Sequence, residues 1–202
     1  MPVFQPTLVS ELIANNVRVE PGATVLDLGC GTGFIGLEMA KRGAIVTCSD
    51  IMPEACAVAR GRGLNAIQSD LFQNIQGKFD CIIDDVSGIC DQVARLSPWY
   101  PEPIPTGGFD GSETPCRMIE QAPAFLNKGG VLYLPISTLS NYKKTLREAD
   151  RRFQLKNIRS KWIPFCKELE SGFEQLKSAP IEVIKRGSRH LWEFRLYELR
   201  LV

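Results

Sequence analysis

A glycine-rich stretch, DLGCGTGFIG at positions 27–36, carries the residue types best suited to hold a cofactor in this chain of 202 residues. Gly31, Gly33 and Gly36 spell G-x-G-x-x-G, the spacing of a strand-to-helix turn that cradles a dinucleotide. Gly29, Gly31 and Gly33 spell G-x-G-x-G. The first frame leaves Gly29 inside the preceding strand, which it would weaken. We therefore favour the second frame and assign Gly36 a packing role in the helix that follows.

Three acids come at the ends of three successive apolar runs. Asp27 lies two residues before the first glycine, Asp50 ends the second run and Asp70 ends the third. The carboxyl ends of parallel strands share one edge of a sheet, so these acids are expected to converge on one crevice. A carboxylate after the second strand offers two acceptor oxygens to two ribose hydroxyls, which suits NAD and S-adenosylmethionine alike. Asp70, with Leu71 beside it, is suited to an adenine.

The elements that position these residues alternate between strand and helix as far as about residue 150. Apolar runs predict strands at 23–29, 44–50, 65–70, 79–86 and 131–136. Helical patterns with caps predict a loop and then a helix within 3–16 with Thr7 as N-cap, and helices at 34–43, 53–63, 112–130 and 141–153. Beyond Phe153, strands at 154–165 and 190–201 enclose an insert. This pattern predicts an α/β, Rossmann-like three-layer sandwich with a mostly parallel sheet.

Composition favours one ordinary globular domain, at 44% hydrophobic and 23% charged residues with a net charge of +1. Seven cysteines, an odd number with no C-x-x-C pair, argue against a disulfide framework or a zinc site. His190 is the single histidine, so we predict no metal site and no histidine-based triad. No leader pattern and no membrane-spanning apolar run are present, which leads us to expect a cytoplasmic protein without a membrane partner.

The sequence VLDLGCGTG, followed by Asp50 and by the triplet SDL, resembles the class I S-adenosylmethionine-dependent methyltransferases. Three further segments resemble the release-factor glutamine methyltransferase family and its relatives that methylate amides or RNA bases. They are VFQPT at 3–7, GGFDGSE at 107–113 and LNKGGVLYLPI at 126–136. The resemblance extends from Phe4 to about Ile136. It implies a seven-stranded sheet with an antiparallel last strand, S-adenosylmethionine as cofactor and S-adenosylhomocysteine as product.

The resemblance also implies which residues hold the cofactor. Asp27 would anchor its amino group, Asp50 its ribose hydroxyls and Asp70 its adenine amine. The full set comes from the N-terminal segment, the glycine turn and the strand ends, and comprises Phe4, Pro6, Asp27, Gly29, Gly31, Gly33, Asp50, Ile51, Asp70 and Leu71.

The chain departs from that family at the end of the fourth strand, where the family carries Asn-Pro-Pro-Tyr. Here Asp85, Val86, Ser87 and Gly88 occupy those places. Methyl transfer is an in-line displacement that depends mostly on alignment, and a carboxylate beside the nucleophile can accept its proton or orient it. Neighbouring strand residues point to opposite faces. We name Asp85 and Asp84 as candidate catalytic residues and favour Asp85.

Candidate substrate contacts surround this point. A proline-rich loop at 97–111 contains Trp99 and Tyr100, which could cover a small substrate and exclude water. Ser87 precedes that loop, and Phe165 lies next to the insert between the last two strands. We predict that these four side chains meet the substrate.

Several functions remain open from the sequence. We expect a single domain over 1–202, with an N-terminal lid at 1–17 and a terminal strand pair at 153–202 that carries an insert at 166–180.

Such compactness favours a methyltransferase acting on a small molecule with an amine, guanidine or hydroxyl nucleophile. One alternative is a protein or RNA substrate, and another is a protein that uses the sulfonium for other chemistry such as cyclisation. An NAD-dependent oxidoreductase is disfavoured because no suitable His or Tyr-Lys arrangement accompanies the first glycine frame. The oligomeric state stays open.

Overall fold

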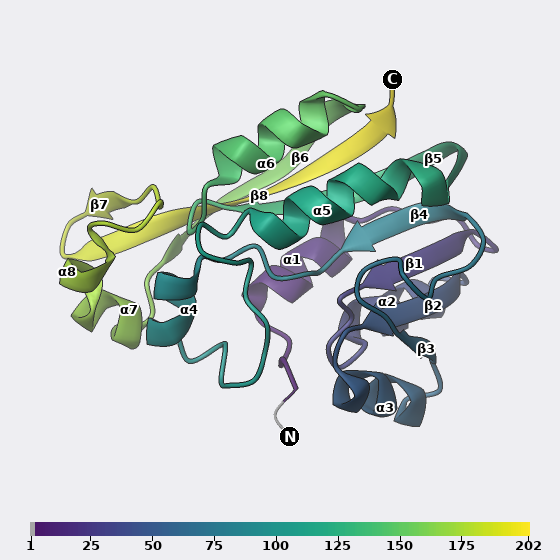
Figure 1. The fold of residues 1–202 in the computed structure, drawn as a ribbon, viewed down its shortest axis with the longest axis horizontal. Coiled ribbons are helices and arrows are strands. Elements are labelled where there is room, and N and C mark those ends of the chain that lie inside the picture. Colours follow the sequence, from purple (N-terminus) through teal and green to yellow (C-terminus); the bar gives the residue numbers. More distant parts are fainter. Residues whose placement is uncertain (1–2) are drawn as a thin grey trace.

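The fold is a single mixed sheet between helices, seen in a computed structural model that describes residues 3–202 (Figure 1). The helices are α1 (Leu8–Asn16), α2 (Phe34–Lys41), α3 (Pro53–Gly61), α4 (Asp91–Leu96), α5 (Glu113–Gln121), the 3-10 helix η1 (Ala122–Phe125), α6 (Tyr142–Asp150), α7 (Lys167–Ser171) and α8 (Phe173–Leu176). The strands are β1 (Thr24–Leu28), β2 (Ile45–Asp50), β3 (Asn65–Gln68), β4 (Phe79–Asp84), β5 (Leu126–Ser137), β6 (Phe153–Pro164), β7 (Ile184–Arg186) and β8 (Arg189–Leu201).

The sheet runs in the order β3-β2-β1-β4-β5-β8-β6, and β7 pairs with β8. The first five strands are parallel to one another, whereas β8 is antiparallel to both β5 and β6. This confirms the mostly parallel, Rossmann-like sheet with an antiparallel last strand. The predicted count of seven strands is wrong, because the sheet described over residues 3–202 has eight. The additional strand, β7, pairs with the start of β8 across a tight turn. It has three residues, too few to give a recognisable apolar pattern in the sequence.

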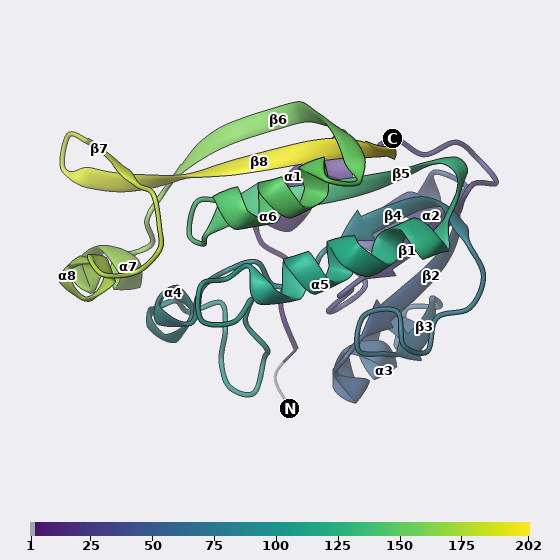
Figure 2. The same cartoon turned by 45° about the horizontal axis from the view of Figure 1, so that its top comes forward.

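Helices cover the sheet on two faces (Figure 2). Side chains alternate between the faces along each strand. In β4, Cys81 and Ile83 pack with α1 and α2, whereas Ile82 packs with α5 and α6. This confirms the three-layer arrangement. Among residues 3–202 no helix combines the length and apolarity needed to cross a bilayer.

In the middle of the chain one expectation is wrong and one helix was missed. The helix predicted over 112–130 ends at Gln121, passes through the 3-10 helix and gives way to strand at Leu126, because Pro123 interrupts the α-helical hydrogen bonding. In addition, α4 lies just before the loop at 97–111 and was not predicted, since six residues are too few for a clear helical period.

Helix α1 is held at both of its ends. Thr7 caps its start, accepting from the amide of Val9, and the Thr7 amide donates back to Ser10, which confirms the predicted cap. At the other end the guanidinium of Arg42, just after α2, donates to the carbonyls of Ala14 (2.6 Å) and Val17 (2.9 Å). These carbonyls have no partner within the helix, so Arg42 joins α1 to α2.

We predict that Arg42→Ala lowers the free energy of unfolding by about 1 to 3 kcal/mol, because two hydrogen bonds from a charged donor are lost. Urea denaturation measures this change. Arg62 occupies the equivalent position after α3, is exposed and makes no side-chain hydrogen bond among residues 3–202, so Arg62→Ala should stay within about 0.5 kcal/mol of the parent. Equal losses in the two variants would show that Arg42 does not join the helices.

Candidate functional site

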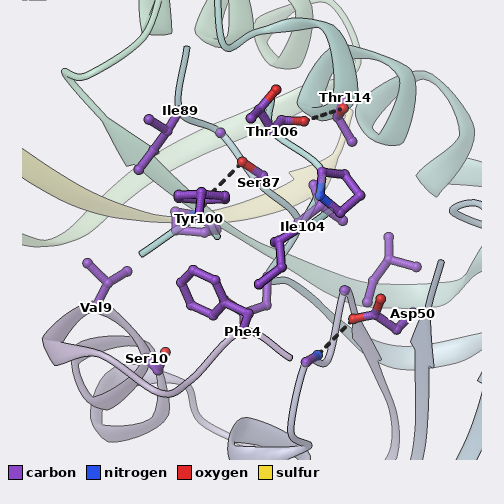
Figure 3. A pocket seen from close by; sticks show the side chains of 18 of the residues that line it. Phe4, Val9, Ser10, Asp50, Ser87, Ile89, Tyr100, Ile104, Thr106 and Thr114 are labelled. Atoms are coloured by element: carbon purple, nitrogen blue, oxygen red, sulfur yellow. Dashed lines mark hydrogen bonds between the residues drawn. The ribbon is translucent and has the colours of Figure 1, made fainter. Parts of the chain in front are cut away.

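A cavity of about 440 Å³ lies at the carboxyl ends of the parallel strands (Figure 3). It is lined by most of the residues that the sequence singles out, which come from the N-terminal segment, the glycine turn, three strand ends and the loop at 97–106. These are Phe4, Gly29, Gly31, Asp50, Ile51, Asp70, Leu71, Asp85, Ser87, Trp99 and Tyr100. Residues far apart in the chain therefore converge on one space.

The glycine turn has the form that the second frame requires. Gly29 and Gly31 both line the cavity and have φ values of +80° and +52°, which favour glycine. A Cβ at Gly29 would lie 2.8 Å from the amide nitrogen of Val86, so only glycine lets the turn approach the end of β4. Gly36 instead lies within α2, where a Cβ would meet Cys48 at 2.6 Å. Its role is helix packing, as the sequence analysis expects.

Asp50 is fixed by the same turn. Its Oδ2 accepts from the amide of Gly31 at 2.9 Å, which is the dashed line at Asp50 in Figure 3. Its Oδ1 accepts from the amide of Met52 at 2.8 Å. Each carboxylate oxygen has a further lone pair, so the held carboxylate can still accept from two hydroxyl groups. Asp50 is therefore oriented before any ligand arrives.

Asp27 and Gly33 support the turn without lining the cavity. Asp27 is fully buried, and its Oδ2 accepts from the amide of Gly36 at 2.8 Å at the start of α2. Its Oδ1 has no hydrogen-bond partner among the described residues. Burial, and then the charge of Asp50, raise the pKa of Asp27 to about 7. Gly33 faces α3, where a Cβ would lie 2.7 Å from Leu64.

Asp84 and Asp85 differ in position. Asp84 is 1% exposed, lies outside the cavity lining and accepts from the amide of Val86 at 3.2 Å. Burial raises the pKa of Asp84 to about 8. Asp85 lines the cavity, and its carboxylate makes no hydrogen bond within residues 3–202. Burial, followed by the charges of Asp27, Asp84 and Asp50, raises the pKa of Asp85 well above its usual value.

An aromatic wall stands beside Asp85. The hydroxyl of Ser87 donates to that of Tyr100 at 3.1 Å, and the Tyr100 ring lies 5.4 Å from the ring of Phe4 (Figure 3). Burial raises the pKa of Tyr100 to about 12, so its hydroxyl stays neutral at ordinary pH. Two predicted contacts lie elsewhere. Pro6 is absent from the lining, and Phe165 packs in the core against Phe173.

Sequence reasoning missed other lining residues. Arg117 of α5 donates to Asp70 at 2.9 Å, so Asp70 has a cationic partner at the cavity. The remaining missed residues are mostly apolar and include Val9, Ile13, Ile89, Ile104, Ile163, Trp192 and Phe194. Their apolar patterning is the same as that of core residues, so nothing in the sequence separates them from the core.

The comparisons with known proteins identify this arrangement. A family described as "Methyltransferase domain" matches residues 19–185, which is most of the chain. The chain belongs to this methyltransferase family. It uses S-adenosylmethionine, and the cavity fits that cofactor because the glycine turn, the held Asp50 carboxylate and the apolar Ile51 and Leu71 line one space. When bound, S-adenosylmethionine supplies a methyl group on a positively charged sulfur.

Proteins with sequences similar to this chain are also named as methyltransferases. The chain is 32% identical over 153 residues to the "Putative protein N5-glutamine methyltransferase MJ0928" of Methanocaldococcus jannaschii, covering 72% of this chain and 78% of that protein. It is 36% identical to a release factor glutamine methyltransferase of Cereibacter sphaeroides, over 66% of this chain and 53% of the relative. It is 32% identical to ribosomal RNA small subunit methyltransferase C of Haemophilus influenzae, over 72% of this chain and 42% of the relative. The chain thus spans about half of the latter two proteins.

Solved structures show the same fold. A ribosomal protein L11 methylase from Lactobacillus delbrueckii subsp. bulgaricus superposes with a TM-score of 0.59 at 19% identity, covering 96% of this chain and 80% of that one. The magnesium protoporphyrin IX methyltransferase of Synechocystis, solved with bound S-adenosylmethionine, gives a TM-score of 0.54 at 19% identity, over 95% and 77% of the two chains. At this identity the likeness establishes the fold alone.

We predict that the stability of the ligand-free methyltransferase falls as the pH rises from about 5 to 8. A carboxyl group whose pKa is raised in the folded state binds its proton more tightly there than in the unfolded chain. As the pH rises above the unfolded-state pKa, the group ionises more readily in the unfolded chain, so the free energy of unfolding decreases. Asp84→Asn removes one such group and should reduce the slope of unfolding free energy against pH, by at most about 1.4 kcal/mol per pH unit. Urea denaturation at several pH values measures the slope.

Asp80→Asn, on the same strand, is the matched control. The pKa of Asp80 is lowered, mainly by hydrogen bonds from Thr24 and Asn127, so its stabilising effect is already complete above pH 5. This variant should lose stability at every pH in the range with no change in slope. A parent-like slope in Asp84→Asn would disprove the raised pKa.

Proposed function

We propose that the protein transfers the methyl group of S-adenosylmethionine to a nitrogen of a protein side chain, with that nitrogen held at Asp85. The observation that carries this proposal is the unpaired Asp85 carboxylate on the cavity, at the end of β4 and next to the glycine turn. An amide or amine nitrogen presents N–H donors, which a carboxylate without another partner can accept.

The proposed chemistry needs alignment and one proton acceptor. Asp85 accepts a hydrogen bond from the nucleophile and orients its lone pair toward the methyl group. The carbonyl of Val86 accepts no hydrogen bond within residues 3–202 and offers a second acceptor for the same NH₂ group. As the N–C bond forms and the S–C bond breaks, the nitrogen becomes cationic and its proton passes to Asp85. The products are the methylated nitrogen and neutral S-adenosylhomocysteine.

The choice of a protein substrate rests on relatives and on charge. The Methanocaldococcus jannaschii relative, which this chain matches over 78% of its length, is named for protein glutamine methylation. The sequence alone favoured a small molecule, and the names of the relatives support the alternative of a protein or RNA substrate better.

An RNA substrate is less well supported by the surface around α6. Glu148 pairs with Arg151 and Arg152, Lys143 pairs with Glu182, and Lys144 lies 3.6 Å from Asp110. Three carboxylates therefore pair with four cations, and Arg147 on α6 makes no ion pair among residues 3–202, so these pairs reduce the positive charge available to phosphates without removing it.

We predict that methyl-tritiated S-adenosylmethionine labels the protein fraction of a lysate from cells lacking this enzyme, rather than the RNA or small-molecule fraction. If the acceptor is an amide nitrogen, acid hydrolysis of the labelled protein should release volatile methylamine, whereas a methylated amine keeps its label on the amino acid. The Asp85→Leu variant should label at least about 100-fold more slowly, because leucine can accept neither the proton nor a hydrogen bond from the nucleophile.

The control is Asp150→Asn, which alters an exposed carboxylate at the end of α6, outside the cavity lining and without a hydrogen bond or ion pair of its side chain among residues 3–202, and should label at the parent rate. Label confined to RNA or to small molecules would overturn the protein assignment. A parent-like rate for Asp85→Leu would overturn the role of that residue.

We further predict that S-adenosylmethionine binds more tightly as the pH rises from 6 to 8.5, and that S-adenosylhomocysteine responds less. The sulfonium favours the ionised forms of Asp27, Asp84 and Asp85, whose pKa values are raised, whereas the neutral thioether does not. The limiting effect is about tenfold per pH unit for each proton released. Calorimetry on both ligands measures it, and Asp85→Asn should reduce the difference. Equal pH profiles for the two ligands would contradict this electrostatic coupling.

A further inference from the structure

Positive charge gathers on one edge of the sheet. Residues 151–202 carry twelve Lys and Arg against six Asp and Glu, whereas residues 1–150 carry twelve against seventeen. Much of the later excess lies on strands β6, β7 and β8, where six cations make no ion pair and no side-chain hydrogen bond among residues 3–202. We call these six the basic edge, and they are Lys156, Arg159, Lys161, Lys185, Arg186 and Arg189. Five of them are exposed and Lys161 is half-buried.

The acids near the basic edge are already engaged. Strands β6 and β7 contain no Asp or Glu. On β8, Glu193 and Glu198 each pair with the arginine two positions further on, at 2.6 and 3.0 Å. Glu170 of α7 contacts the ring Nδ1 of His190 at 2.7 Å. The charge of the basic edge is therefore left for an anionic partner.

The three cations of β6 are evenly spaced on one face of an edge strand. β6 is last in the sheet order and pairs only with β8 among the described strands. The register partners of Lys156, Arg159 and Lys161 alternate along β8, so the three side chains share a face. Two residues of strand separate successive cations, which places them about 7 Å apart. This spacing is close to that of successive phosphates in an extended single strand of nucleic acid.

The β7–β8 hairpin carries the charge past the end of β6. Leu191 of β8 is the register partner both of Pro164, the last residue of β6, and of Ile184, the first residue of β7. The turn with the other three cations therefore projects beyond β6 (Figure 2). Measured along β8, the basic edge extends about 30 Å from Lys156 to Arg189.

The chemistry of the basic edge favours phosphate groups. Three of its six cations are arginines, whose planar guanidinium binds phosphate oxygens in a bidentate manner. Binding to a lipid surface would require apolar side chains that insert beside the charges. The exposed large apolar residues lie elsewhere in the described chain, apart from Leu201 and Val202 at the end of β8 opposite the hairpin. An acidic protein segment lacks the regular charge on every unit that a nucleic acid strand has.

We propose that the basic edge binds the phosphate backbone of single-stranded RNA, the nucleic acid that is commonly single-stranded in cells. The bound RNA would pass close to the cavity, because Ile163, two residues beyond Lys161 on the same face of β6, is a lining residue. This inference concerns docking and goes beyond the proposed function. A protein acceptor would then reach the cavity as part of a complex with RNA.

The test measures how binding of a fluorescein-labelled oligouridylate depends on salt, by fluorescence anisotropy. Each phosphate contact on a single strand contributes about 0.7 to the slope of log affinity against log salt. Six contacts predict that the affinity of the parent falls about 20-fold between about 50 and 100 mM KCl. Removing three contacts should reduce this fall to about 4-fold.

Two triple variants remove three contacts each. One is Lys156→Gln/Arg159→Gln/Lys161→Gln on β6, and the other is Lys185→Gln/Arg186→Gln/Arg189→Gln on the hairpin. Both should bind RNA more weakly than the parent and show the reduced salt dependence. Urea denaturation establishes that each variant is folded.

The matched control removes three exposed cations elsewhere. Arg62, Lys78 and Lys128 are exposed, make no ion pair among residues 3–202 and lie outside the basic edge. The variant Arg62→Gln/Lys78→Gln/Lys128→Gln changes the net charge by the same amount and should keep the salt dependence of the parent. Poly-L-glutamate, phosphatidylserine vesicles and duplex DNA serve as the other anionic partners, and each should bind more weakly than oligouridylate.

The proposal is overturned if oligouridylate does not bind the parent, or if the control variant loses as much salt dependence as the two basic-edge variants. Equal or tighter binding of poly-L-glutamate, of the vesicles or of duplex DNA would also overturn it. None of these measurements depends on methyl transfer. A failed RNA-binding test therefore leaves the tritium-labelling result for the proposed function unaffected, and the reverse also holds.

Discussion

The structure depends on gathering carboxyl groups where the parallel strands end. Burial raises the pKa of Asp27, Asp50, Asp84 and Asp85, and the charges of the first three raise the pKa of Asp85 further. Such a concentration of acid is unfavourable in a folded chain unless it is compensated. Backbone amides of the glycine turn and of the start of α2 provide part of that compensation. A cationic ligand can provide the rest, so this arrangement of carboxyl groups favours the binding of a sulfonium.

The order of the strands in the sheet determines what the glycine turn contacts. Gly29 has to approach the backbone of Val86, and it can do so because β1 and β4 are neighbours in the sheet. The amide of Gly31 reaches Asp50 because β1 also pairs with β2. Strand order, turn conformation and the orientation of the carboxylates therefore specify one another. Arg42 extends this to α1, whose Val9, Ser10 and Ile13 form part of the cavity wall.

The sequence was most informative where a residue has one physical use. Glycines with positive φ, strand-ending acids and the Thr7 cap were all predictable because few other residue types serve there. It was least informative for short or ambiguous elements such as α4 and β7. It also gave no signal for Trp192 or Phe194, since an aromatic residue facing a cavity and one facing the core have the same pattern. Asp84 and Asp85 lie between these two cases, since the sequence predicted part of their arrangement. Strand alternation predicted that they diverge and favoured Asp85 as the residue at the cleft, and in the structure Asp85 lines the cavity whereas Asp84 is buried in the interior.

The division of the cavity walls has an evolutionary consequence. The residues expected to hold the cofactor lie between Phe4 and Leu71, and much of the remaining cavity lining comes from the loop after α4 and from β5, β6 and β8. Substitutions in the later segments can accumulate without altering the glycine turn or the hydrogen bonds of Asp50. An ancestral enzyme of this design could diversify its acceptors while inheriting one methyl donor, with Phe4, beside both Gly31 and Tyr100, as the residue under selection from both sides.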